Sequence, residues 1–81
     1  MNIEYEKKLG KNLRYIRESC GLTQEQVSAK LQTLGCDITR SALAKIEVGQ
    51  RHIYPDEIYF LSKIYNTSYT DIFVEINSHH I

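Results

Sequence analysis

Residues 21–51 contain two helix starts and two helix stops, and this spacing constrains the fold more than any other feature of the chain. The first start has capping-box spacing, in which a threonine side chain bonds a free backbone N–H and a glutamine three residues later bonds the backbone of the cap residue. Each stop is a glycine, which can take the left-handed conformation that ends a helix. The signals are Thr23 (with Gln26) and Thr39 as starts, and Gly35 and Gly49 as stops. The sequence therefore predicts two consecutive short helices.

Apolar side chains recur at helical intervals in both predicted helices. In the first helix, which we expect to continue to residue 34, they are Val27, Leu31 and Leu34. In the second helix, Leu43 and Ile46 form the buried side. On a helical wheel at about 100° per residue, the opposite side of the second helix carries polar and small side chains. They are Arg40, Ser41, Ala44, Lys45 and Val48.

This polar strip suits contact with a DNA groove. Small side chains allow a helix to sit deep in the groove, and Arg and Lys side chains bond to guanine edges or to phosphates. The alternative interpretation is an amphipathic surface helix whose charged face only meets water. The wheel does not separate the two interpretations, but the surrounding sequence does.

Three ordered segments resemble the Cro and phage-repressor type of helix-turn-helix proteins, also called the XRE family. The segment LGKNLRYIRESCGLTQEQVSAKL is similar to the first two helices of the family. The segment ITRSALAKIEVGQR is similar to its recognition helix and following turn, and LSKIYNTSYTDIF to its fourth and fifth helices. The resemblance implies an all-α, five-helix lambda-repressor-like domain, with the helix-turn-helix formed by helices two and three.

The connection between helices two and three is longer than the usual turn of three or four residues. In our interpretation, residues 32–34 add a turn to helix two and residues 35–38 form the connection. This resembles a longer-turn variant of the family. We divide the chain into one DNA-binding domain, residues 1–76, and a short tail, residues 77–81.

The helix-turn-helix interpretation separates base contacts, which read sequence, from phosphate contacts, which set register. Gln24 resembles the family residue that bonds a phosphate beside the recognition helix, and Arg40 is the best candidate for a guanine reader. The predicted base-reading residues are Arg40, Ser41, Ala44 and Lys45. The predicted phosphate contacts are Gln24, Thr23, Thr39, Gln50, Arg51 and His52.

The family also pairs an arginine at the position of Arg17 with a glutamate at the position of Glu47, which ties helix one to the recognition helix. The resemblance implies this structural ion pair; the alternative is that both are ordinary solvated charges. Helix one is expected over about residues 4–19. Its predicted core residues are Tyr5, Leu9, Leu13, Ile16 and Cys20.

Two further helices are predicted near the end of the chain. One spans Pro55–Tyr65, with proline at a favoured first-turn position, and the other follows Ser68, with Asp71 at capping-box distance. Their apolar surface is wide for one core face, which suggests a homodimer interface. The predicted interface residues are Tyr69, Ile72, Phe73 and Ile76. The alternative is that they only close the core of a chain this small.

Charge is unevenly distributed in a chain whose formal net charge is zero. Residues 1–51 hold nine Lys and Arg against six Asp and Glu, whereas residues 52–81 hold one against four. The basic part is therefore the part that carries the motif. We expect weak non-specific affinity for DNA, because few phosphates would be neutralised.

Several classes of protein are disfavoured. No apolar run approaches the roughly 20 residues of a membrane span, and the N-terminus lacks the apolar run of a signal peptide, so we expect a cytoplasmic location. Cys20 and Cys36 lack CxxC spacing, which favours reduced, partly buried thiols. No phosphate loop, paired carboxylates or activated nucleophile indicates an enzyme, and no cofactor is expected. No metal site is expected either, and the adjacent His79 and His80 are interpreted as solvent-exposed.

The sequence thus predicts a sequence-specific DNA-binding transcriptional regulator, a repressor, which binds a pseudo-palindromic operator as a dimer through the major groove. One alternative is a protein-interaction module or antitoxin-type partner that uses the apolar C-terminal face, because fold alone does not settle function. A second alternative is that the chain is a fragment of a longer regulator.

Overall fold

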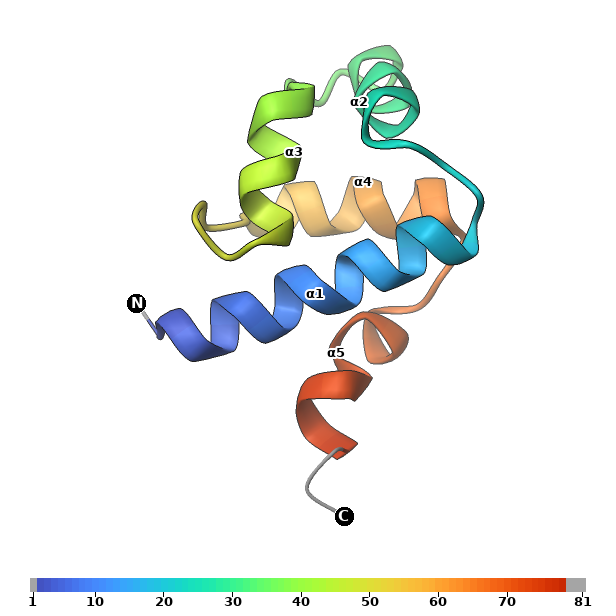
Figure 1. Cartoon of the computed structure of the whole chain (residues 1–81). Coiled ribbons are helices and arrows are strands. Elements are labelled where there is room, and N and C mark those ends of the chain that lie inside the picture. The colour runs from blue at the N-terminus through green and yellow to red at the C-terminus, as the bar shows by residue number, and fades with distance from the viewer. Residues whose placement is uncertain (1, 79–81) are drawn as a thin grey trace.

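The computed structural model describes residues 2–78 of the 81-residue chain, and side chains as far as residue 73. Within this part the chain forms five helices and no strand, as predicted. The helices are α1 (Ile3–Ser19), α2 (Gln24–Thr33), α3 (Arg40–Glu47), α4 (Pro55–Tyr65) and α5 (Tyr69–Ser78). Figure 1 shows α2 and α3 above α1, with α5 below it. No helix in this described part is long and apolar enough to cross a membrane.

Side-chain caps start the two helices of the central motif. The Thr23 hydroxyl accepts a hydrogen bond from the Gln26 N–H (3.1 Å), and the Thr23 N–H donates to the Gln26 side chain (2.9 Å). The predicted capping box is therefore confirmed. The Thr39 hydroxyl accepts from the Ala42 N–H at 3.1 Å and so caps α3. These bonds satisfy backbone donors that a helix leaves free in its first turn.

The core gathers side chains from every helix and from the connection between α2 and α3. Its fully buried members include Leu13, Val27, Leu31, Ile38, Leu43, Leu61 and Ile72. Two predicted core positions were wrong, because Tyr5 (39%) and Cys20 are exposed. Leu34, which continues the apolar spacing of the first predicted helix, is 47% exposed. Helix α2 ends at Thr33, one residue before the expected end, and Leu34 is the C-cap residue. The apolar spacing of the helix therefore no longer directs the Leu34 side chain inward.

The connection after α2 supplies buried side chains of its own. Cys36 is 6% exposed and Ile38 is 1% exposed. Two side chains of α2 bond the Ile38 carbonyl: the Ser28 hydroxyl donates at 2.9 Å and the Gln32 amide at 3.3 Å. The longer turn is thus a packed segment that fixes α3 against α2. Burial raises the pKa of the Cys36 thiol, so it stays protonated at neutral pH.

Helix α1 crosses the C-terminal end of α3 at Gly10. A Cβ atom at this position would lie 2.3 Å from the carbonyl oxygen of Ile46 and 2.8 Å from the carbonyl carbon of Glu47. Only glycine fits such an approach of two backbones. The crossing therefore sets the position of α3 relative to the rest of the molecule.

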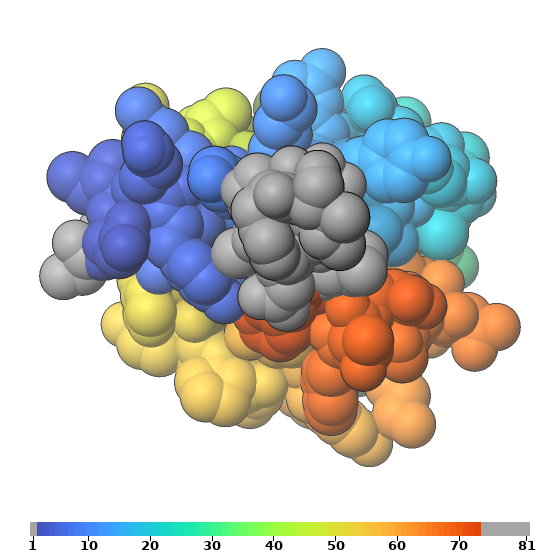
Figure 2. Space-filling model, turned by 90° about the horizontal axis from the view of Figure 1, so that it is seen from below, coloured from blue at the N-terminus to red at the C-terminus, as the bar shows by residue number. Residues whose placement is uncertain are grey.

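Helix α5 packs under α1 and belongs to the core. The buried Asn12 side chain donates hydrogen bonds to the carbonyls of Asp71 (3.1 Å) and Ile72. Figure 2 shows side chains of α1 and α5 next to each other on the lower face. The helix continues to Ser78, two residues past the predicted domain boundary at residue 76. Residues 79–81 of the predicted tail, with His79 and His80, lie outside the described residues.

Candidate nucleic-acid interface

The outward face of α3 carries the predicted base-reading residues. Arg40, Ser41 and Lys45 are exposed and Ala44 is half-buried, whereas Leu43 and Ile46 on the opposite side are 0% and 2% exposed. Within the described residues, neither Arg40 nor Lys45 forms an ion pair or a side-chain hydrogen bond. The face thus offers two uncommitted cations beside small side chains, a combination that fits base edges in a major groove.

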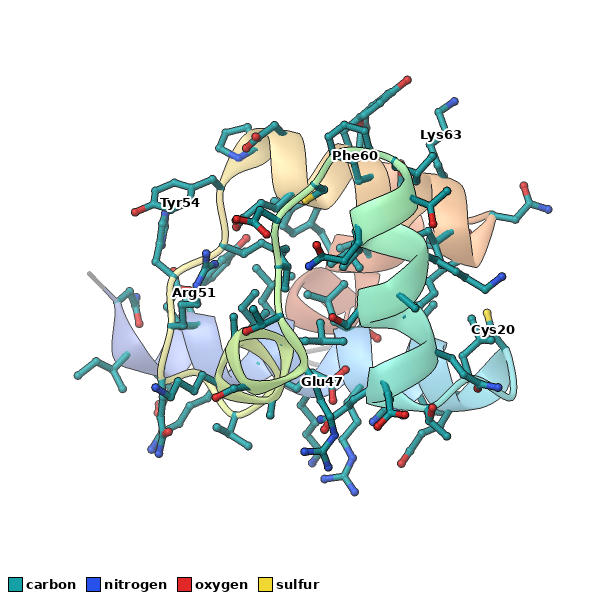
Figure 3. All side chains as sticks on the ribbon, turned by 90° about the horizontal axis from the view of Figure 1, so that it is seen from above. Cys20, Glu47, Arg51, Tyr54, Phe60 and Lys63 are labelled. Carbon is teal, nitrogen blue, oxygen red and sulfur yellow. The ribbon has the colours of Figure 1, made fainter. Side chains whose placement is uncertain are left out.

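A buried network holds α3 in place and contains the ion pair that the family resemblance implies. The Arg17 guanidinium donates two hydrogen bonds to the Glu47 carboxylate, at 2.8 and 3.0 Å, and the side chains are 9% and 1% exposed. Arg17 also donates to the Leu22 carbonyl at 2.9 Å. The hydrogen bond with Glu47 raises the pKa of Arg17. Figure 3 shows Glu47 where α3 and α2 meet α1.

Gln24 joins the same network. Its side-chain amide donates to the Glu47 carboxylate at 2.9 Å, so one carboxylate binds side chains from both α1 and α2. This contact orients the Gln24 amide beside the first turn of α2. The sequence interpretation placed Gln24 on a phosphate but missed its bond to Glu47, which no local spacing signals.

Three other residues predicted to contact phosphates have exposed side chains. Thr23 and Thr39 are exposed, and each hydroxyl, which accepts the capping bond, still has its own proton to donate. Gln50 is also exposed, and its backbone N–H donates to the Lys45 carbonyl at 2.8 Å. These residues lie at the two ends of α3 and at the start of α2, where backbone contacts flank a helix that enters a groove.

Arg51 and His52 each contact a glutamate of a neighbouring helix, Glu57 of α4 and Glu6 of α1. The two Nη atoms of Arg51 donate to the two oxygens of Glu57 at 3.0 Å, and His52 Nδ1 lies 3.2 Å from the Glu6 carboxylate. The hydrogen bond with Glu57 raises the pKa of Arg51. In Figure 3, Arg51 and Tyr54 lie close together on the segment that follows α3. The charge of Arg51 is therefore already paired within the protein.

The five helices and the exposed face of α3 define the class: an all-α, lambda-repressor-like domain with a helix-turn-helix formed by α2 and α3. The chain belongs to the XRE-type helix-turn-helix family, a family of DNA-binding regulators, whose model matches residues 13–72. It is also similar to the crystal structure of the DNA-binding domain of BldD. That similarity has a TM-score of 0.76 and 28% identity, over 89% of this chain and 97% of the other. No curated protein matches the chain.

Proposed function

We propose that this protein is a sequence-specific DNA-binding transcription regulator that inserts α3 into the major groove. The observation that carries the proposal is the outward face of α3, where Arg40 and Lys45 are exposed and uncommitted while the Arg17–Glu47 pair fixes the helix from behind. A helix held rigidly and presenting such side chains is suited to direct readout. The similarity to the BldD DNA-binding domain supports the same function.

The proposed division of labour follows from position on α3. Arg40, Ser41, Ala44 and Lys45 contact base edges, with Arg40 bidentate to a guanine. Gln24, Thr23, Thr39 and Gln50 contact phosphates on either side of the groove. We expect Arg51 and His52 to contribute less, because Glu57 and Glu6 bind them.

We further propose that the protein acts as a repressor on a pseudo-palindromic operator, bound by two copies. One recognition helix reads only a few base pairs, whereas two copies related by a two-fold axis read half-sites about one helical turn, ~34 Å, apart. Of the predicted interface residues, Tyr69 is 50% exposed and Phe73 is half-buried. Ile72 is fully buried within the monomer, so its prediction as an interface residue was wrong. Ile76 lies among the residues whose side chains are not described.

A random-duplex selection with the purified protein tests the proposal. We expect enrichment of an inverted repeat with half-sites about one turn apart. Arg40→Ala should then cost about 1–3 kcal/mol of binding free energy and relax one operator position, while Gln24→Ala should weaken all sequences alike. An unchanged sequence preference in Arg40→Ala would remove Arg40 from the reading role.

The alternative is a protein-interaction module that uses the apolar C-terminal face. Burial of Ile72 removes one of its predicted residues, and such a module has no need of exposed Arg40 and Lys45. No enrichment in the selection, with only weak salt-sensitive binding, would favour this alternative over DNA readout.

A further inference from the structure

The four arginines of the chain differ in how they are paired with carboxylates of the protein. This pairing affects which of them are available for the proposed DNA binding. The guanidinium of Arg17 faces the Glu47 carboxylate, which is 1% exposed, and that of Arg51 faces the Glu57 carboxylate, which is 10% exposed. Turning either arginine toward a DNA phosphate would leave a buried carboxylate without its partner, which is costly. Neither arginine is therefore a ready phosphate ligand.

Arg14 differs from both. Its Nε lies 3.3 Å from the Glu18 carboxylate one helical turn away, and the two side chains are 57% and 53% exposed. An ion pair this open to water contributes little to stability, because the solvent screens it. Arg14 can therefore exchange Glu18 for another anion, or bond both, since a guanidinium carries five N–H donors.

The location of Arg14 points to that anion. Arg14 lines an open hollow where the C-terminal end of α1 meets the first turns of α2 and α3. The hollow holds three guanidinium groups against two carboxylates. Its lining residues are Arg14, Arg17, Glu18, Gly21, Leu22, Thr23, Gln24, Glu25 and Arg40. Because the proposed base reader Arg40 lines the same hollow, a DNA strand that Arg40 contacts would lie beside Arg14.

Building on the proposed function, we propose that Arg14 binds a backbone phosphate of the operator from α1, outside the helix-turn-helix. Glu18 holds the guanidinium at the hollow in the free protein, and the phosphate takes its place or shares it when α3 docks. Arg14 then supplies the flanking cationic contact for which Arg51, paired with Glu57, is unsuited. The contact sets register and affinity and reads no base.

Salt titrations of the selected duplex test this contact. The slope of log affinity against log salt changes by about 0.9 for each phosphate contact, so Arg14→Gln should flatten the slope by about 0.9 and weaken all sequences by the same factor. Lys63→Gln is the matched control, because it removes one exposed positive charge from α4, where Lys63 lies over the Tyr59 ring. Figure 3 shows Lys63 at the upper edge of the molecule, away from Glu47. This variant should keep the wild-type slope.

A methylphosphonate scan locates the phosphate. Each operator phosphate is replaced in turn by its uncharged analogue. At one position the replacement should lower the affinity of the wild type several-fold but should not lower the affinity of Arg14→Gln further. If the wild type selects a sequence but Arg14→Gln has the same salt slope and the same scan pattern as the wild type, the Arg14 contact is overturned. The proposed function then still stands. A wild type that selects no sequence would overturn both. Unfolding curves of Arg14→Gln should match the wild type, since the side chain is exposed.

Discussion

At the scale of single residues, Gly10 has less room for a Cβ atom than any other glycine of the chain. Its missing Cβ would meet the Ile46 carbonyl oxygen at 2.3 Å, and backbone atoms do not turn away as a flexible side chain does. Replacing glycine by alanine inside a helix otherwise gains roughly 1 kcal/mol. We expect Gly10→Ala to lower the free energy of unfolding by about 1–3 kcal/mol instead, through overpacking, as measured by urea denaturation.

Gly35→Asn is the control for Gly10→Ala. Gly35 has a φ of +83° with open space around its Cβ position, and asparagine tolerates the left-handed region better than other side chains. Its cost should be less than about 1 kcal/mol. A Gly10→Ala variant as stable as the wild type would mean that α1 and α3 do not approach each other as closely at Gly10 as the structure has it.

Glu57 gives the molecule an acid-sensitive contact. Burial alone would raise its pKa, but hydrogen bonds from Arg51 and from the Tyr54 N–H hold the pKa below its ordinary value of 4.5. The unfolded chain therefore takes up the proton first as the pH falls, so the stabilisation is present above about pH 4.5 and is lost as the pH drops through the folded-state pKa. We expect the free energy of unfolding to fall across this window, in denaturation series between pH 7 and pH 3.

Glu57→Gln should flatten this pH dependence and lower the stability at pH 7, because the glutamine cannot form the ion pair with Arg51. Asp56→Asn, at the exposed neighbouring position, should keep the wild-type dependence. Equal pH slopes in wild type and Glu57→Gln would assign the acid sensitivity to other carboxylates.

At the scale of elements, capping chemistry predicted the starts of α2 and α3, because Thr23 and Thr39 act on backbone groups only three residues away. Helical spacing likewise predicted Val27, Leu31, Leu43 and Ile46 as core. It failed at Leu34 and gave no signal for Ile38, since neither residue lies inside a helix. The bonds from Ser28 and Gln32 to the Ile38 carbonyl depend on how the turn folds back on α2.

Ile38 and Leu34 form a matched pair for testing the packed connection. Both are aliphatic side chains of the same size, but Ile38 is 1% exposed and Leu34 is 47% exposed. Ile38→Ala should cost about 2–5 kcal/mol by removing buried surface and leaving a cavity, whereas Leu34→Ala should cost less than about 0.5 kcal/mol. Urea denaturation of the two variants measures the difference. Similar costs would mean that the connection is not packed as the structure has it.

At the scale of the whole molecule, the sequence predicted which part of the chain is basic, but not which basic side chains are paired with glutamates of the protein. Glu6 and Glu57 bind His52 and Arg51 from separate helices, at separations of 46 and 6 residues. Such pairings depend on tertiary packing, so a count of charges along the chain overstates the cations available to DNA. The family resemblance supplied the Arg17–Glu47 pair, and only the structure added Gln24 to it.

The proposed dimer can be tested apart from folding, because Tyr69 and Ile72 lie on the same helix with opposite exposure. Tyr69 is 50% exposed and Ile72 is 0% exposed. Tyr69→Arg should leave the free energy of unfolding within about 0.5 kcal/mol of wild type, yet weaken self-association and cooperative binding to a two-half-site operator, since a charge at an interface core is unfavourable. Sedimentation and binding to single and double half-sites measure this. Folding and binding to a single half-site should be unchanged in Tyr69→Arg, so any loss of cooperativity would come from the contact between the two copies. Unchanged cooperativity in Tyr69→Arg would therefore place the two-fold contact on another surface.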